Sequence, residues 1–274
     1  MLLNDISVFH PIFEQPNNVI MRILTSIVLL IAFSVSALAG VSPKEKQALV
    51  DLYTATNGAE WNTTWNLDAD VTTWKGVTVF RDNVIALNLV NNNLTGQLPE
   101  SVGDLQNLKV LNLHKNNITG NIPATLATIH GLKSLNLSFN NINGSLPTNF
   151  TALVNLEYMD LFFNNIEGEL PQNIGDMKKL KRISLYNNKF SGELPTSIVA
   201  LVKLKDLQLS SNKLSGSLPQ GMEVLISLQR LSVFDNNMTG YLPTGIQNMH
   251  QLKEFEVASN KFTYKKATIV AVNE

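Results

Sequence analysis

The sequence predicts an α/β solenoid in which stacked coils share a parallel β-sheet, with a helical cap at the N-terminal end. Three observations predict this fold class. A 24-residue pattern recurs from Val84 onward without one insertion or deletion. Within each repeat, apolar residues two apart indicate a half-buried strand. Glycine and proline recur in a single register, so that seven of the ten prolines stand at the same position of the repeat.

Residues 1–39 are expected to lie outside this fold. Met21 and Arg22 precede an apolar run that ends in small residues before Gly40. This pattern is typical of a secretory signal over residues 21–39, cleaved after Ala39. The run is shorter than the ~20 residues that span a bilayer, so no stable membrane span is expected after cleavage. Residues 1–20 contain no Lys or Arg and are interpreted as an over-called extension.

Residues 40–83 are predicted to form the N-terminal cap. Ser42 and Glu45 make a capping box around Pro43, which predicts a helix that runs to Asn57-Gly58. A solenoid needs covered ends to stay soluble, so we expect large aromatic side chains here to shield the first repeat rather than to bind a ligand. All the tryptophans of the chain follow the helix, namely Trp61, Trp65 and Trp74.

Residues 84–263 contain seven full repeats and one partial repeat. An asparagine such as Asn116 follows each strand, and its amide is expected to turn inward and satisfy buried backbone groups. A later apolar pair, such as Leu126 and Ile129, is predicted to face the same core from the outer side, on short helical or 3₁₀ turns. The pattern breaks at Tyr264 and Lys266, so residues 264–274 are predicted to form a C-terminal cap.

The repeat resembles the plant-type, 24-residue class of leucine-rich repeat proteins. The most specific part of the resemblance is the stretch Leu94-Thr95-Gly96-Gln97-Leu98-Pro99. The resemblance implies a right-handed superhelix with the sheet on its concave face and a second short strand near each Gly-x-Leu-Pro segment. It also implies receptor-like ectodomains or polygalacturonase-inhibiting proteins as relatives. The chain departs from the plant pattern because the cap cysteines are missing.

The composition excludes several classes of function. The chain has 21 Lys+Arg and 22 Asp+Glu, and this formal net charge of −1 offers no electrostatic footprint for nucleic acid. It has no cysteine, which excludes disulfides, thiolate catalysis, Fe–S clusters and thiolate zinc sites. No metal-ligand cluster is visible, and no cofactor is expected. An exported protein without disulfides must draw its stability from other interactions.

The concave face is the candidate binding surface. Residues between the inward leucines point to this face, and equal positions of neighbouring repeats form columns. Aromatic residues concentrate on three adjacent strands, fringed by Arg and Asp, which is typical of a binding surface. A strand also favours aromatic residues by propensity, and that plainer interpretation stays open. The candidate ligand-binding residues are Phe139, Tyr158, Asp160, Phe162, Phe163, Arg182, Tyr186, Arg230, Phe234 and Asp235.

Two further patterns occur on the repeats. His114 faces Ser138 of the next strand, but no orienting carboxylate stands behind the imidazole, so no catalytic residue is predicted. A ladder of Thr, Ser and Asn precedes the glycine row and is broken at Glu167. Such a ladder is compatible with ice binding or with ordinary turn chemistry.

The sequence therefore predicts a non-catalytic binding module that is secreted or held at the cell surface. Its predicted partner is a protein, a peptide or a glycan. Two alternatives remain at this point: an inhibitor of a secreted hydrolase, similar to polygalacturonase-inhibiting proteins, and, more remotely, an ice-binding protein.

Overall fold

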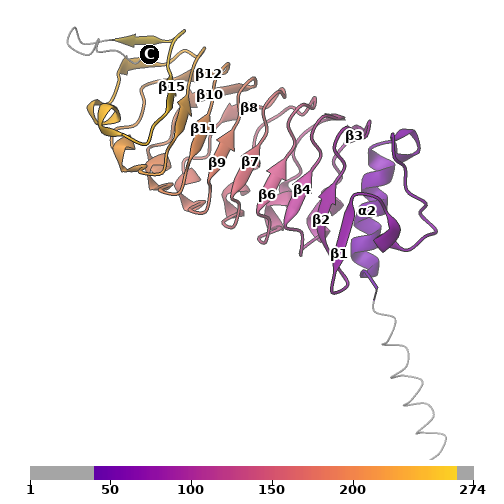
Figure 1. Ribbon diagram of the computed structural model, residues 1–274. Coiled ribbons are helices and arrows are strands. Elements are labelled where there is room, and N and C mark those ends of the chain that lie inside the picture. The colour runs from indigo at the N-terminus through magenta and orange to yellow at the C-terminus, as the bar shows by residue number, and fades with distance from the viewer. Residues whose placement is uncertain (1–39, 264–274) are drawn as a thin grey trace, which may run out of the picture. The chain divides into compact units, whose positions relative to one another are not determined.

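A computed structural model of the protein describes residues 40–263. The predicted signal segment, the expected extension before it and the predicted C-terminal cap lie outside these residues. Within them the chain forms a solenoid, with one strand per coil on one face and a short 3₁₀ segment on the other (Figure 1).

The main sheet has nine strands among the described residues, in the order β1-β2-β4-β6-β7-β9-β11-β13-β15. β1 and β2 form an antiparallel hairpin, and each later strand pairs in parallel with the strand of the preceding coil. The strands are β1 Val77–Phe80, β2 Asn83–Asn88, β4 Val110–Asn112, β6 Ser134–Asn136, β7 Tyr158–Asp160, β9 Arg182–Ser184, β11 Asp206–Gln208, β13 Arg230–Ser232 and β15 Glu254–Glu256.

The predicted register is confirmed. Leu87 pairs with Leu111 and Leu111 with Leu135, so inward residues stack coil upon coil and are fully buried. Each coil of apolar side chains cannot bury itself alone, but its neighbours cover it on both sides. Large side chains such as Phe150 and Phe190 fill the same continuous core.

The outer side of the coils carries the predicted 3₁₀ turns. Their apolar residues, such as Leu126, point back into the core and are fully buried. A 3₁₀ turn closes each coil in few residues, which suits a repeat of only 24. The segments are η4 Glu100–Asp104, η5 Ala124–Thr128, η6 Phe150–Ala152, η7 Ile174–Asp176, η8 Thr196–Ala200, η9 Met222–Val224 and η10 Thr244–Asn248.

The short second strands implied by the resemblance are present in most coils. They form three small parallel sheets among the described residues. Each of them contains the glycine position of its repeat or ends one residue before it, and the third full repeat has no second strand. The strands are β3 Thr95–Gln97 with β5 Asn117–Thr119, β8 Glu167–Glu169 with β10 Lys189–Glu193 and β12 Lys213–Ser215, and β14 Thr239–Tyr241 with β16 Lys261–Thr263.

The cap begins with helix α2, Pro43–Ala55, whose start is the expected capping box. Ser42 Oγ accepts a hydrogen bond from the Glu45 backbone N–H at 3.2 Å. The helix stops at the expected Asn57-Gly58: Thr56 is its C-terminal cap, with its hydroxyl donating to the Leu52 carbonyl at 2.6 Å, and Asn57 leaves the helix with a left-handed φ of +57°. Two 3₁₀ segments follow, η2 Gly58–Glu60 and η3 Val71–Thr73.

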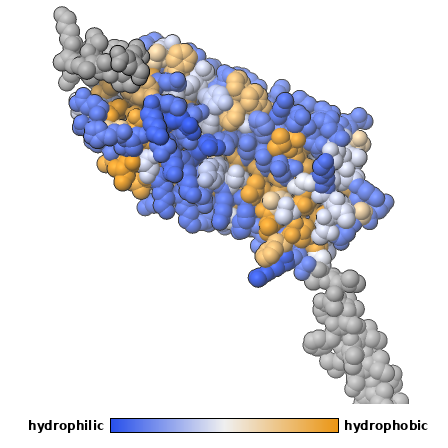
Figure 2. All heavy atoms as spheres, viewed as in Figure 1, coloured by the Kyte–Doolittle hydropathy of each residue, from blue (hydrophilic) through white to orange (hydrophobic). Residues whose placement is uncertain are grey.

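The three tryptophans are buried in the cap, as the sequence predicts. Trp65 lies edge-on to Trp61 at 4.9 Å and stacks on Trp74 at 4.8 Å, centroid to centroid. The indole N–H of Trp65 donates to the Lys75 carbonyl at 2.9 Å. In Figure 2, hydrophobic residues gather mainly toward this end of the visible face, and the rest of that face is predominantly hydrophilic.

Candidate ligand-binding surface

Five aromatic rings meet where neighbouring strands of the main sheet end. We call them the aromatic cluster: His114, Phe139, Phe162, Phe163 and Tyr186. They follow β4, β6, β7 and β9, and occupy two adjacent positions just after the strand in each coil. Because parallel strands pair in register, residues from successive coils are brought to within ring-contact distance.

The rings of the cluster pack as two stacked pairs set at right angles. Phe139 stacks on Phe163 with centroids 4.5 Å apart and an interplanar angle of 19°. Phe162 stacks on Tyr186 at 4.5 Å and 10°. The two pairs meet edge to face, with angles of 81° between Phe139 and Phe162 and 79° between Phe163 and Tyr186. Such pairs each contribute about 1 kcal/mol beyond area burial, so the cluster is a preorganised surface.

Two rings of the cluster remain exposed to solvent. Phe139 is 42% exposed and Phe163 is 39% exposed. Both residues have a left-handed backbone, with φ of +54° and +52°, which turns their side chains outward. Glycine or asparagine adopts this conformation more cheaply, whereas other residues lose roughly 1–2 kcal/mol there. The equivalent residue is left-handed in every coil, for example Lys115 and Ser211, so the conformation belongs to the repeat. What distinguishes these two coils is that they place a bulky apolar ring at this water-facing position.

His114 joins the cluster through a hydrogen-bonded chain beneath it. Its Nδ1 lies 2.8 Å from Ser138 Oγ, which donates to Asn136 Oδ1 at 2.6 Å. Asn136 Oδ1 also accepts from the Ser138 backbone N–H, so Ser138 Oγ must accept from His114 Nδ1–H. The imidazole meets Phe139 edge-on at 5.4 Å. Ser138 is completely buried, so it cannot present its hydroxyl to a substrate.

A row of alternating charges lies beside the cluster, toward the start of the strands. Asp206 accepts from Arg230 and lies 3.7 Å from Arg182, whose guanidinium also lies 3.6 Å from Asp160. Both arginine side chains are 40% exposed, whereas both carboxylates are largely covered. Arg182 also lies over the Tyr158 ring, 5.6 Å from its centroid. The arginines therefore offer donors to a ligand, and the aspartates hold them in place.

Asp160 is a correction to the predicted site, because its carboxylate is buried rather than displayed. The residue ends β7 and is 8% exposed. Burial raises the pKa of Asp160, and the Arg182 guanidinium offsets part of this effect. Burial also raises the pKa of the Tyr186 hydroxyl, and the nearby Asp160 charge adds to the effect.

Phe234 and Asp235 lie apart from the cluster. Phe234 is 41% exposed and occupies the same repeat position as Tyr186, two coils away. The coil between them has Ser210 and Ser211 in place of aromatic residues. The ring pairs that join the cluster end at Tyr186. Arg230 remains connected to the site through Asp206 alone.

Two residues of the site were missing from the predicted set. The ring of His114 belongs to the cluster. Asp206 bridges both arginines. The sequence does contain a signal for Asp206, because this residue stands at the same repeat position as Arg182 in the preceding coil and Arg230 in the following coil.

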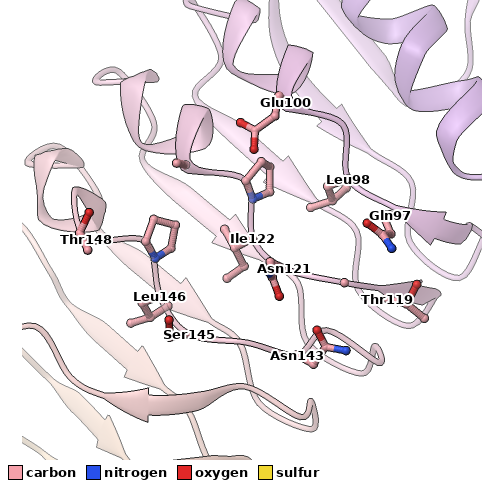
Figure 3. A pocket seen from close by; sticks show the side chains of 14 residues that line it. Gln97, Leu98, Glu100, Thr119, Asn121, Ile122, Asn143, Ser145, Leu146 and Thr148 are labelled. Carbon is pink, nitrogen blue, oxygen red and sulfur yellow. The ribbon is translucent and has the colours of Figure 1, made fainter.

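A shallow groove of about 830 Å³ lies on a different surface, along the Gly-x-Leu-Pro segments of the first three coils (Figure 3). Its walls are mostly uncharged, with Gln97, Asn121 and Ser145 from successive coils. The predicted polar ladder borders it. Thr119 Oγ1 of that ladder donates to the Gly96 carbonyl at 3.0 Å, which is a structural use of the hydroxyl.

Neither a membrane helix nor a metal cluster was found in residues 40–263. No helix in that range has the length and apolarity that crossing a bilayer requires. The same residues contain no group of three or more His, Asp or Glu side chains placed to hold a metal ion.

Comparison with known proteins identifies the family. A family model described as a leucine-rich repeat region matches residues 140–272, and a second leucine-rich repeat model matches residues 82–142. A search of curated proteins found no significant match.

Solved structures resemble the chain at 26–34% identity. The ectodomain of the Arabidopsis thaliana receptor kinase GASSHO1/SCHENGEN3, in complex with CASPARIAN STRIP INTEGRITY FACTOR 2, is 34% identical, with a TM-score of 0.63. The match covers 65% of this chain and 22% of that one. The Arabidopsis receptor kinase HAESA, in complex with the peptide hormone IDA and the co-receptor SERK1, is 31% identical, with a TM-score of 0.62. Here 64% of this chain and 29% of that chain are covered.

A plant ice-binding protein is 26% identical, with a TM-score of 0.68, over 81% of this chain and 80% of that one. The chain thus spans less than a third of the two receptor ectodomains and four fifths of the ice-binding protein. The family models, the parallel sheet and the 24-residue coils agree: the chain belongs to the leucine-rich repeat proteins, with repeats of the plant type.

Proposed function

We propose that this protein is a non-catalytic binding module that holds a peptide or protein segment on the aromatic cluster. The observation that carries the proposal is the pair of exposed phenylalanines, Phe139 and Phe163, at left-handed positions of a preorganised five-ring cluster. Aromatic anchors surrounded by fixed hydrogen-bond donors are typical of the energetic centre of an interface. The resembled plant receptors support this choice of partner, because HAESA is in complex with the peptide hormone IDA.

The proposed location is extracellular, either released or held at the cell surface. The sequence supports this through the signal-like segment at residues 21–39. The resemblance to receptor ectodomains supports it independently.

The test is a binding screen against secreted peptides, glycans and hydrolases. The wild type is compared with a Phe162→Ala/Tyr186→Ala double variant, which removes one stacked pair. Because truncating central aromatic anchors costs at least about 2 kcal/mol, affinity for the ligand falls at least about thirtyfold. A Phe80→Ala/Tyr241→Ala variant removes two exposed aromatics outside the cluster and retains wild-type affinity.

Each result of the screen separates the alternatives. Equal binding by the wild type and the cluster variant contradicts the site. Stoichiometric suppression of a hydrolase shows the inhibitor function instead, and binding of glycans alone replaces the peptide with a sugar ligand.

Ice binding is a second candidate function, favoured by the structural similarity to the plant ice-binding protein across most of both chains. The Thr, Ser and Asn ladder would be the surface concerned. The bond from Thr119 to the Gly96 carbonyl and the charge of Glu167 count against it. The test is a measurement of thermal hysteresis in a solution of the wild type. A difference between the melting and freezing temperatures of ice supports ice binding, and the absence of a difference rejects it.

A further inference from the structure

The net charge of the chain is close to zero, but one edge of the solenoid is strongly basic. Each coil reaches the main sheet through a four-residue turn, and these turns are residues 106–109, 130–133, 154–157, 178–181, 202–205, 226–229 and 250–253. Together they contain eight lysines and a single carboxylate, Glu157. We call them the lysine edge. The lysines are Lys109, Lys133, Lys178, Lys179, Lys181, Lys203, Lys205 and Lys253, all exposed except for the half-buried Lys181.

Contacts between coils show that these turns form one continuous edge. The Lys109 ammonium lies against Gly131 of the next turn. Lys179 donates to Asn155 Oδ1 of the preceding turn at 2.6 Å. Coils are about 4.8 Å apart, so the row from Lys109 to Lys253 is about 29 Å long.

Exposed aliphatic side chains are interleaved with the lysines. Val154, Val202 and Ile226 occupy the same position of their turns and are 44%, 47% and 72% exposed. Val224, two residues before Ile226, is 47% exposed. Exposed branched aliphatic side chains do not help to keep a surface soluble. A row of them beside lysines is instead the composition typical of a surface that lies in a membrane interface.

The carboxylates near the edge do not cancel its charge. Glu157 is bound to Lys181 at 2.5 Å, and Asp104 is bound to Lys44 at 2.8 Å. Asp176 and Glu223 lie on the preceding 3₁₀ segments. Within the seven turns, the eight lysines and the one carboxylate leave an excess of seven positive charges.

We propose that the lysine edge binds the surface of an anionic lipid bilayer. The lysines would lie among the anionic headgroups while the aliphatic side chains enter the interface. An acidic polysaccharide would satisfy the lysines but would leave the aliphatics unexplained. The lysine edge lies where the strands begin, whereas the aromatic cluster lies where they end. A docked protein therefore keeps the cluster free for its ligand.

The test is flotation of the full chain with vesicles of phosphatidylcholine, with and without about 30% phosphatidylserine. We expect binding only to the vesicles that contain phosphatidylserine, and release at high salt because screening shortens the reach of surface charges. Each lysine near such a surface strengthens binding about fivefold, so a Lys178→Gln/Lys203→Gln/Lys205→Gln variant binds about a hundredfold more weakly. Val202→Ser/Ile226→Ser weakens binding without changing the charge.

The matched control is Lys189→Gln/Lys213→Gln/Lys261→Gln, which makes the same charge change at exposed lysines of the second strands. It retains vesicle binding within about twofold of the wild type, as expected if the edge rather than net charge binds the bilayer. All variants share residues 1–39, so any contribution of that segment is common to them. Equal loss in both triple variants overturns the proposal, as does wild-type binding to polygalacturonate or heparin without binding to vesicles. Neither result bears on the aromatic cluster.

Discussion

At the scale of single residues, one asparagine per coil joins the backbones of neighbouring coils. Asn164 Oδ1 accepts from the Ile142 N–H at 3.0 Å, and its Nδ2 donates to the carbonyls of Leu137 and Leu161, both at 3.0 Å. Asn164→Ala leaves buried backbone groups unpaired, so we expect a loss of about 3 kcal/mol in the free energy of unfolding. Urea denaturation measures it. The adjacent Asn165→Ala is the control, and equal effects of the two variants would contradict the role of Asn164.

Asp160 makes stability depend on pH in a defined direction. Because burial raises its pKa above the ordinary 3.8, the folded state binds more protons than the unfolded state between 3.8 and the raised value. Stability therefore falls as pH rises through that window, and the loss persists at higher pH. We expect the Tm of Asp160→Asn to rise relative to that of the wild type as the pH increases above about 4.

Scanning calorimetry at several pH values measures the Asp160 effect. Glu169→Gln, which removes an exposed carboxylate, controls for the change in net charge. A Tm difference between Asp160→Asn and wild type that stays constant with pH would show that Asp160 does not experience the burial seen here.

At the scale of elements, the junction between the cap and the first coil depends on close backbone approach. Gly96 has a φ of +132°, and a Cβ there would collide with the carbonyl oxygen of Ala55 at the end of α2. Gly221 also has a positive φ, of +84°, but faces open space. We expect Gly221→Ala to cost about 1 kcal/mol from backbone strain alone, and Gly96→Ala to cost about 3 kcal/mol or more because it also displaces the helix.

Thermal unfolding of the two alanine variants measures this difference, with tryptophan fluorescence reporting the cap. Similar losses in both variants would mean that the contact between Gly96 and Ala55 contributes nothing to stability.

The elements differ in how far the sequence predicts them. The strand register, the inward Asn116 and the cap tryptophans follow from period, polarity and composition, which are local properties. The end of α2 before Asn57-Gly58 also follows from a local signal, because asparagine and glycine favour the left-handed backbone that Asn57 adopts after the helix.

The burial of Asp160 was missed because it depends on what the side chains of adjacent strands cover. The columns place His114 beside Ser138, and the structure joins the two by a hydrogen bond. The contacts of the imidazole with Phe139 and Phe162 were missed because they depend on how the side chains turn after the strands.

At the scale of the whole molecule, the coil is the unit of both stability and function. Each coil contacts only its neighbours, so the solenoid tolerates loss of a whole coil when the new neighbours match. Deleting residues 108–131 joins the coil of Asn88 to that of Asn136 and removes His114, but keeps the four phenylalanine and tyrosine rings together. We expect this variant to fold and bind the ligand, with a urea m-value about a tenth lower because less surface is exposed on unfolding.

Deleting residues 156–179 removes the same length of chain but takes away Phe162 and Phe163. This variant folds with the same reduction in m-value, because its new junction again places an inward leucine column in register, yet it fails to bind the ligand. Circular dichroism and urea titration establish that both deletions are folded, and titration with the ligand compares their affinities. Retained binding after loss of residues 156–179 would place recognition outside the aromatic cluster, and unfolding of both variants would contradict the independence of the coils.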